Sequence, residues 1–220
     1  MRKPSASKAL ATLAALAALC LCQAARAAPA LDFDQVFNDR AEPARLHFQA
    51  AYVVNGVKHR LEAWREGGSQ LRRRADDAVE TFIFRRRGEA DWRMVVLDLA
   101  RNIRTDLDRT SLARVGHFTD WFGLAHGLAR PAGAYTLVQA AAPALAVSPL
   151  APCRWYRLTE SSRASDVCWS SRLRLPLLIA DASGVQWQVT GADTRVGKDA
   201  MVIADQGFVK NDAAADIKGD

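Results

Sequence analysis

The stretch RLHFQAAYVVNGVKHRLEAWRE, from Arg45 to Glu66, predicts a β-hairpin. Apolar side chains alternate with polar ones in its first half, as in a strand that buries one face. These apolar residues are Leu46, Phe48, Ala50, Tyr52 and Val54. Asn55-Gly56 then supplies the two residues typical of a tight hairpin turn. Pairing outward from this turn sets His59 against Tyr52 and Leu61 against Ala50, so the apolar face continues onto the second strand.

Strand-like segments continue on both sides of a central helical segment, with short turns and no strand–helix–strand alternation. The predicted strands cover residues 70–75, 79–87, 92–99, 102–107, 134–140, 153–158, 166–173, 175–181, 185–192 and 200–205. The predicted fold class is therefore α+β, mainly antiparallel β, in one domain over residues 28–220. Residues 211–220 are predicted to be a polar tail.

Residues 109–130 break the strand pattern and predict a helical insertion. Their apolar residues recur at helical spacing and include Val115, Phe118, Trp121, Phe122, Leu124, Ala125 and Leu128. Thr110 or Ser111 can cap its start, and Pro131 is expected to stop it. Because Gly116 and Gly123 weaken a helix, we expect a bend or two short helices. The wide apolar surface suits either a fixed core element or a mobile lid.

The first 27 residues predict a cleavable signal peptide. Basic residues precede an apolar run from Ala9 to Cys22, and Ala25-Arg26-Ala27 is an A-x-A cleavage sequence. The sequence therefore predicts a periplasmic, non-membrane-spanning protein. Removing this segment takes away four basic residues and no acidic ones, which lowers the formal charge from +6 to +2. The arginine runs at 72–74 and 85–87 lie close to acidic residues, so we interpret them as a solvated strand face and predict no nucleic-acid partner.

After cleavage only Cys153 and Cys168 remain, and an oxidising compartment favours their pairing. The segment between them reads as a hairpin, and a turn between Glu160 and Ser161 would place the two cysteines opposite each other. We predict a structural disulfide, since no C-x-x-C spacing indicates a reactive pair.

No hydrolase, phosphate-binding, dinucleotide-binding or zinc motif is present in the sequence, so we predict no enzymatic activity, no cofactor and no metal site. His59 lies opposite Tyr52 on the apolar face, where a histidine at the core or at the rim of a cavity is expected. His117 and His126 are nine residues apart in the helical segment, and this spacing does not bring them to one helix face.

The segment from Val167 to Val189, VCWSSRLRLPLLIADASGVQWQV, resembles a pattern of the LolA-like superfamily of exported proteins. An aromatic strand residue, Trp169, is followed by a Leu-x-Leu-Pro-Leu kink at 173–177, a polar turn at 181–184 and a second aromatic strand residue, Trp187. The resemblance implies a strongly curved, open-barrel sheet with a helical lid across an apolar concave face.

That resemblance implies a carrier that holds an acyl chain or another apolar ligand, so a lipid or lipoprotein acyl chain is the expected partner. The residues expected to bind it are Tyr52, His59, Phe118, Trp121, Phe122 and Leu124. Two alternatives stay open: an envelope structural or interaction protein with a filled core and a protein partner, and an enzyme that carries no recognisable motif.

Overall fold

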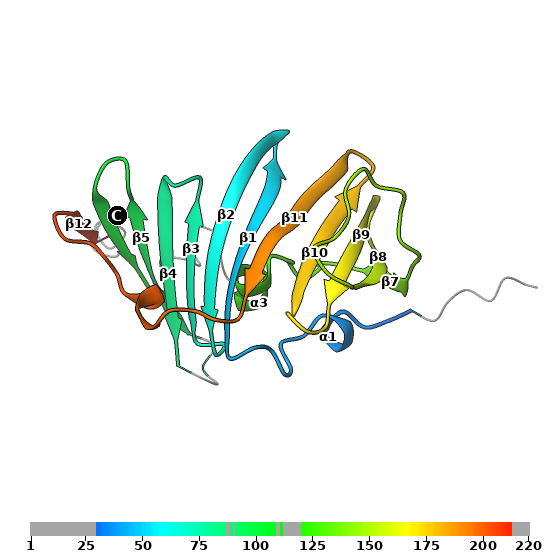
Figure 1. Ribbon diagram of the computed structural model, residues 1–220, viewed down its shortest axis with the longest axis horizontal. Coiled ribbons are helices and arrows are strands. Elements are labelled where there is room, and N and C mark those ends of the chain that lie inside the picture. The colour runs from blue at the N-terminus through cyan, green and yellow to red at the C-terminus, as the bar shows by residue number, and fades with distance from the viewer. Residues whose placement is uncertain (1–29, 87–88, 90, 109–110, 112–119, 213–220) are drawn as a thin grey trace, which may run out of the picture.

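The computed structural model describes residues 30–86, 89, 91–108, 111 and 120–212 of the chain (Figure 1). The predicted signal peptide, Phe118, Gly116, His117 and residues 213–220 of the predicted tail lie outside the described residues.

The described chain forms one open, twelve-stranded sheet in the order β12-β6-β5-β4-β3-β2-β1-β11-β10-β9-β8-β7. Its first half is a meander of β1 (Arg45–Val54), β2 (Val57–Glu66), β3 (Gln70–Ala75), β4 (Val79–Arg85), β5 (Trp92–Asp98) and β6 (Ile103–Leu107). The predicted hairpin is confirmed, because Tyr52 pairs with His59 and Ala50 with Leu61. Asn55 and Gly56 both have positive φ, as this kind of turn requires.

The second half is another meander, and it returns to the middle of the sheet. It comprises β7 (Tyr135–Gln139), β8 (Arg154–Glu160), β9 (Arg163–Ser170), β10 (Leu175–Asp181) and β11 (Gly184–Asp193). β11 pairs antiparallel with β1, which joins the two meanders into one hydrogen-bonded layer (Figure 1). The prediction of a mainly antiparallel β protein is thus confirmed.

The C-terminal segment differs from its prediction. Residues 200–205 do not form a strand: η1, a 3-10 helix, spans Lys198–Met201, and the chain then runs on to the far edge of the sheet (Figure 1). There β12 (Val209–Asp212) pairs in parallel with β6, so the first two residues of the predicted tail are strand. The reason is packing, because Ile203 and Phe208 cover the buried residues Phe82, Val95 and Leu97.

The helical segment is shorter than predicted in the part that the structure describes. Helix α3 spans Trp121–His126, and the side chain of Asp120 accepts hydrogen bonds from the backbone N–H groups of Phe122 and Gly123. Gly127 ends the helix in the left-handed conformation, so the expected stop at Pro131 is wrong. A short helix that the sequence analysis did not predict, α1 (Phe33–Val36), precedes the sheet and buries Phe33.

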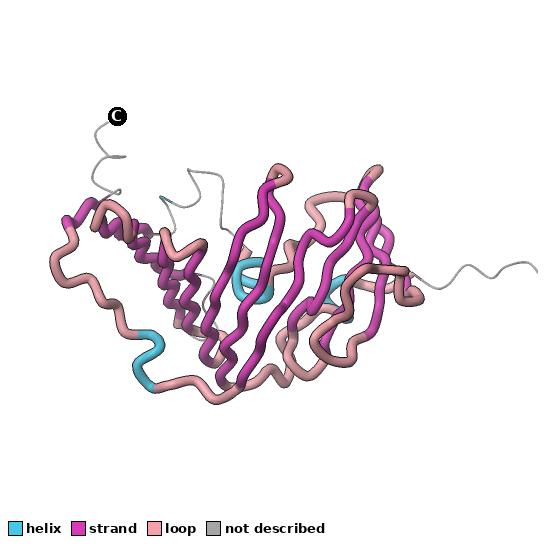
Figure 2. Tube along the Cα trace, turned by 45° about the horizontal axis from the view of Figure 1, so that its top comes forward, coloured by secondary structure: helices cyan, strands magenta, loops and turns pink. Residues whose placement is uncertain are grey.

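The sheet curves around α3. The ring of Trp121 lies 6.3 Å from that of Trp92 in β5, and the ring of Phe122 lies 6.2 Å from that of Trp169 in β9. Six strands separate β5 from β9, which would put them roughly 34 Å apart in a flat sheet. Two consecutive helix residues reach both strands only if the sheet is strongly curved, so α3 lies on the concave face, behind the central strands in Figure 2.

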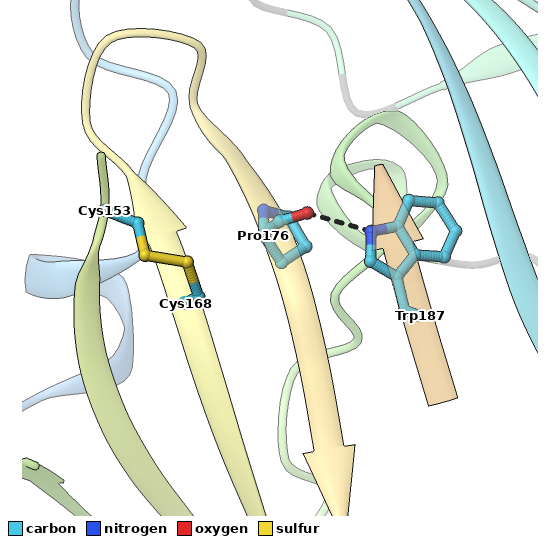
Figure 3. Close-up of a disulfide and its surroundings, with 4 residues drawn as sticks. All are labelled: Cys153, Cys168, Pro176 and Trp187. Atoms are coloured by element: carbon cyan, nitrogen blue, oxygen red, sulfur yellow. Dashed lines mark hydrogen bonds between the residues drawn. A yellow bond between two sulfur atoms is a disulfide. The ribbon is translucent and has the colours of Figure 1, made fainter. Parts of the chain in front are cut away.

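Cys153 and Cys168 form the predicted disulfide, with a Cα–Cα distance of 5.4 Å (Figure 3). The predicted register is wrong by two residues, because Cys168 pairs with Trp155 rather than Cys153. The turn falls one residue later than expected, at Ser161 and Ser162, where Ser161 adopts a positive φ. The disulfide therefore ties β9 to the residue that precedes β8.

Candidate ligand-binding site

A cavity of about 330 Å³ lies on the concave face, beside α3 and over strands β1 to β6, and we call it the concave pocket. The strand register explains its floor. One cross-strand row runs through Arg73, Thr81 and Val96, and a parallel row runs through Leu71, Ile83, Met94 and Leu107. Its lining residues are Tyr52, Leu61, Arg73, Ala75, Val79, Thr81, Ile83, Met94, Val96, Leu107 and Leu124.

The lining is mostly aliphatic and carries no carboxylate. Its three polar side chains are Tyr52, Arg73 and Thr81. Within the described part of the chain, none of the three makes a side-chain hydrogen bond, and Arg73 has no ion pair. All three are partly buried, so their polar groups remain accessible to a ligand that enters the pocket.

Arg73 and Tyr52 form the polar end of the pocket. Burial lowers the pKa of Arg73 below its usual value, and the interaction with Tyr52 opposes this shift. Arginine nevertheless keeps its charge in proteins. Burial also raises the pKa of Tyr52, as does the charge of Asp76, whereas Arg73 lowers it. The two side chains are thus electrostatically coupled, with a cationic guanidinium beside a neutral phenol.

The predicted binding residues fall into two groups. Tyr52 and Leu124 line the pocket. His59 lies next to it rather than in it, because its ring stacks on Tyr52 at 5.2 Å and its Nδ1 lies 2.6 Å from the Asp76 carboxylate. Trp121 and Phe122 are buried in two separate core clusters on either side of α3.

Leu124 forms the wall of the pocket that α3 contributes, and a buried polar cluster holds α3 in place. The guanidinium of Arg65, which is fully buried, donates hydrogen bonds to the carbonyl oxygens of Ala125 (3.2 Å) and Leu173 (3.0 Å). Its Nε lies 3.2 Å from Glu42 Oε2, at ion-pair distance but outside hydrogen-bond geometry. Arg65 therefore connects β2 to both α3 and the β9–β10 turn.

His126 completes this cluster. Its Nδ1 donates to the carbonyl oxygen of Phe122 at 3.0 Å, and its Nε2 lies 3.4 Å from Glu42 Oε2. Burial lowers the pKa of His126, and Arg65 adds to that effect, while Glu42 opposes it. Burial would raise the pKa of Glu42, but the contact with His126 and the charge of Arg65 outweigh it and lower the pKa.

The first arginine run is divided between the two faces of β3, with Arg72 and Arg74 on the convex face. Arg72 and Arg74 both bind the buried carboxylate of Glu80, and Arg72 also lies over the Trp64 ring at 4.3 Å. Arg85, from the second run, lies on the concave side of β4 instead, where it stacks on Trp121 of α3 at 4.0 Å. The expectation of one solvated strand face is therefore wrong. The strand alternation sends Arg73 to the concave pocket and its two neighbours into a partly buried ion-pair network.

A hollow of about 280 Å³ on the convex face contains Arg60, Asp76 and Asp77. Its charges are already compensated, because Arg60 pairs with Asp77 at 2.9 Å and Asp76 binds His59 and the backbone N–H of Arg60. Unlike Arg73 in the concave pocket, these three charged side chains therefore already have partners.

Sequence reasoning did not identify Arg73, Met94, Val96 and Leu107 as site residues. The signal that could have found Arg73 is the alternation of β3, which sets Arg73 on the same face as the apolar residues Leu71 and Ala75. Its cross-strand neighbour on β2, Ala63, is also apolar. No family model matches the chain, and no curated protein is significantly similar to it. Within the described ranges, no helix has the length and apolar character that a membrane crossing requires.

Proposed function

We propose that this protein is a periplasmic carrier or binding protein that holds an apolar chain in the concave pocket. The observation that carries the proposal is the pocket itself. An aliphatic cavity of about 330 Å³ falls within the range of roughly 300–1,000 Å³ typical of small-molecule sites. Filling a cavity of this kind with an apolar ligand removes apolar surface from water, which stabilises the complex.

The arrangement of α3 also supports the proposal. Leu124 is the one α3 residue in the pocket lining, while Trp121 and Phe122 fix the helix to the two flanking clusters. We propose that α3 is the helical lid of a LolA-like, open-barrel sheet, in line with the sequence resemblance. In this proposal Leu124 contacts the ligand, and the aromatic residues of α3 hold the lid.

The direct test is native mass spectrometry of the protein purified from the periplasm after expression of the full chain. A co-purifying lipid supports the carrier function. The test variant is Val96→Trp, which fills the pocket floor. Its matched control is Val53→Trp, which places the same side chain at a half-buried position on the other face of the sheet, in β1.

We expect Val96→Trp to lose the lipid and Val53→Trp to keep it, with both proteins folded by circular dichroism. If wild-type protein carries no lipid and binds neither dodecanoate nor dodecanol, the carrier function is refuted. The alternative of a structural or interaction protein would then be favoured.

A further inference from the structure

Arg73 is the feature of the concave pocket that a purely apolar ligand does not explain. It lies on the pocket floor, between Ala63 of β2 and Thr81 of β4, and forms the polar end of the pocket with Tyr52. No described carboxylate pairs with it, whereas Arg72 and Arg74 on the same strand both bind Glu80. The strand thus carries one uncompensated cation, and that cation faces the cavity.

The energetic consequence depends on what fills the pocket. When the pocket is open to solvent, water can solvate the guanidinium of Arg73. A bound apolar chain displaces that water, and a buried charge without a partner is strongly unfavourable. A ligand that carries its own negative charge avoids this cost, because the guanidinium can donate two parallel hydrogen bonds to a carboxylate.

From these observations we propose that the concave pocket selects a single-chain, long-chain carboxylate, with its head group at Arg73 and Tyr52 and its chain toward Met94, Leu107 and Leu124. This inference rests on the proposed carrier function and specifies its ligand class. The phenol of Tyr52 supplies a further donor at the same end of the pocket. Val79, which is 38% exposed and also lines the cavity, marks the open side beside that polar end.

The size of the pocket limits the ligand to one chain. Its volume of about 330 Å³ is at the lower end of small-molecule sites, which run from roughly 300 to 1,000 Å³. Groups that carry two or three acyl chains are therefore disfavoured. Cationic amphiphiles are excluded by charge, because they would bring a second positive charge against Arg73.

The test is isothermal titration calorimetry of the delipidated mature protein with dodecanoate and with dodecanol. The two ligands have the same alkyl chain length and differ in the charge of the head group. Because a charge-assisted hydrogen bond strengthens binding by roughly ten- to a hundredfold, we expect dodecanoate to bind more tightly by about that factor. Arg73→Met should abolish this preference, because dodecanoate loses its cationic partner and dodecanol no longer displaces water from a charge, so that dodecanoate binds more weakly and dodecanol more tightly. The control is Arg60→Met, which removes the same charge from an exposed site on the other face of β2.

Tyr52→Phe provides a second, milder variant that removes one hydroxyl and leaves the ring. It should weaken dodecanoate binding several-fold and dodecanol binding hardly at all, and it decides the question if Arg73→Met does not fold. Equal affinity for the two ligands in the wild type, or an unchanged preference in the folded variants, overturns the carboxylate inference alone. If neither ligand binds, both the carboxylate inference and the proposed carrier function are overturned.

Discussion

Replacing Gly127 with alanine tests how firmly α3 is held against the sheet. Gly127 has a φ of 71°, and a Cβ atom at this position would lie 2.8 Å from Cη2 and 2.9 Å from Cζ2 of Trp187. Trp187 cannot easily move, because it is 7% exposed and its Nε1 donates a 2.8 Å hydrogen bond to the carbonyl oxygen of Pro176 (Figure 3). The substitution therefore combines a strained backbone with a steric clash.

The two contributions can be estimated separately. A left-handed conformation costs a non-glycine residue about 1–2 kcal/mol. Overpacking of a well-packed core costs about 1–3 kcal/mol more. We expect Gly127→Ala to lower the free energy of unfolding by about 2–5 kcal/mol. For a urea m-value of about 2 kcal/mol/M, the unfolding midpoint falls by roughly 1–2.5 M.

The assay is urea unfolding followed by tryptophan fluorescence and circular dichroism, with two glycine controls. Gly56 also has a positive φ, but a Cβ atom there would meet nothing within 4 Å, so Gly56→Ala measures the backbone strain alone. Gly133 has open space and no positive φ, and Gly133→Ala should change stability little. If Gly127→Ala is no more destabilising than Gly56→Ala, the contact between the end of α3 and Trp187 does not constrain the fold.

Three further predictions concern the polar cluster and the disulfide. Arg65→Met should destabilise the protein by about 3–5 kcal/mol in urea unfolding, because it leaves Glu42 buried without its cation, and a change below 1 kcal/mol would contradict that role. Folding lowers the pKa values of both Glu42 and His126, so the unfolded chain binds more protons, and the free energy of unfolding should fall as the pH drops below 6.5, the ordinary pKa of imidazole. A His126→Phe variant should show a flatter dependence of the urea midpoint on pH. The same dependence in wild type and variant would exclude His126 as the cause. Cys153 and Cys168 are separated by 15 residues, and replacing both with serine should lower the free energy of unfolding by about 3 kcal/mol without changing ligand affinity. Recovery of both as free thiols in non-reducing peptide mapping of the wild type would refute the disulfide.

Local sequence determined the strands and many of their pairings. The alternation before Asn55-Gly56 fixes which side chains of β1 face the core, because a strand has a side-chain period of two residues. The two-residue turn then fixes the register with β2. The cysteine pairing could be predicted for a similar reason, although the turn at Ser161 and Ser162 moved the register by two residues.

Longer-range packing decided what local patterns could not. Residues 200–205 alternate like a strand, yet Ile203 packs onto Phe82 and Val95 instead of joining the sheet, and pairing with β6 begins only at Val209. Nothing near Val209 in the sequence indicates this, because β6 lies about a hundred residues earlier in the chain. Edge pairing depends on where a free strand edge lies in space.

The candidate site shows the same division. Tyr52 and Leu124 could be predicted as pocket residues because each lies on the apolar face of its own element. Arg73 could not, since three consecutive arginines have the same local chemistry and differ only in their surroundings. The tertiary structure brings Glu80 to Arg72 and Arg74 on one face of β3 and leaves Arg73 in the concave pocket on the other. Sequence thus determined the alternation of β3, and the curvature of the sheet around α3 decided that one of its faces borders a cavity.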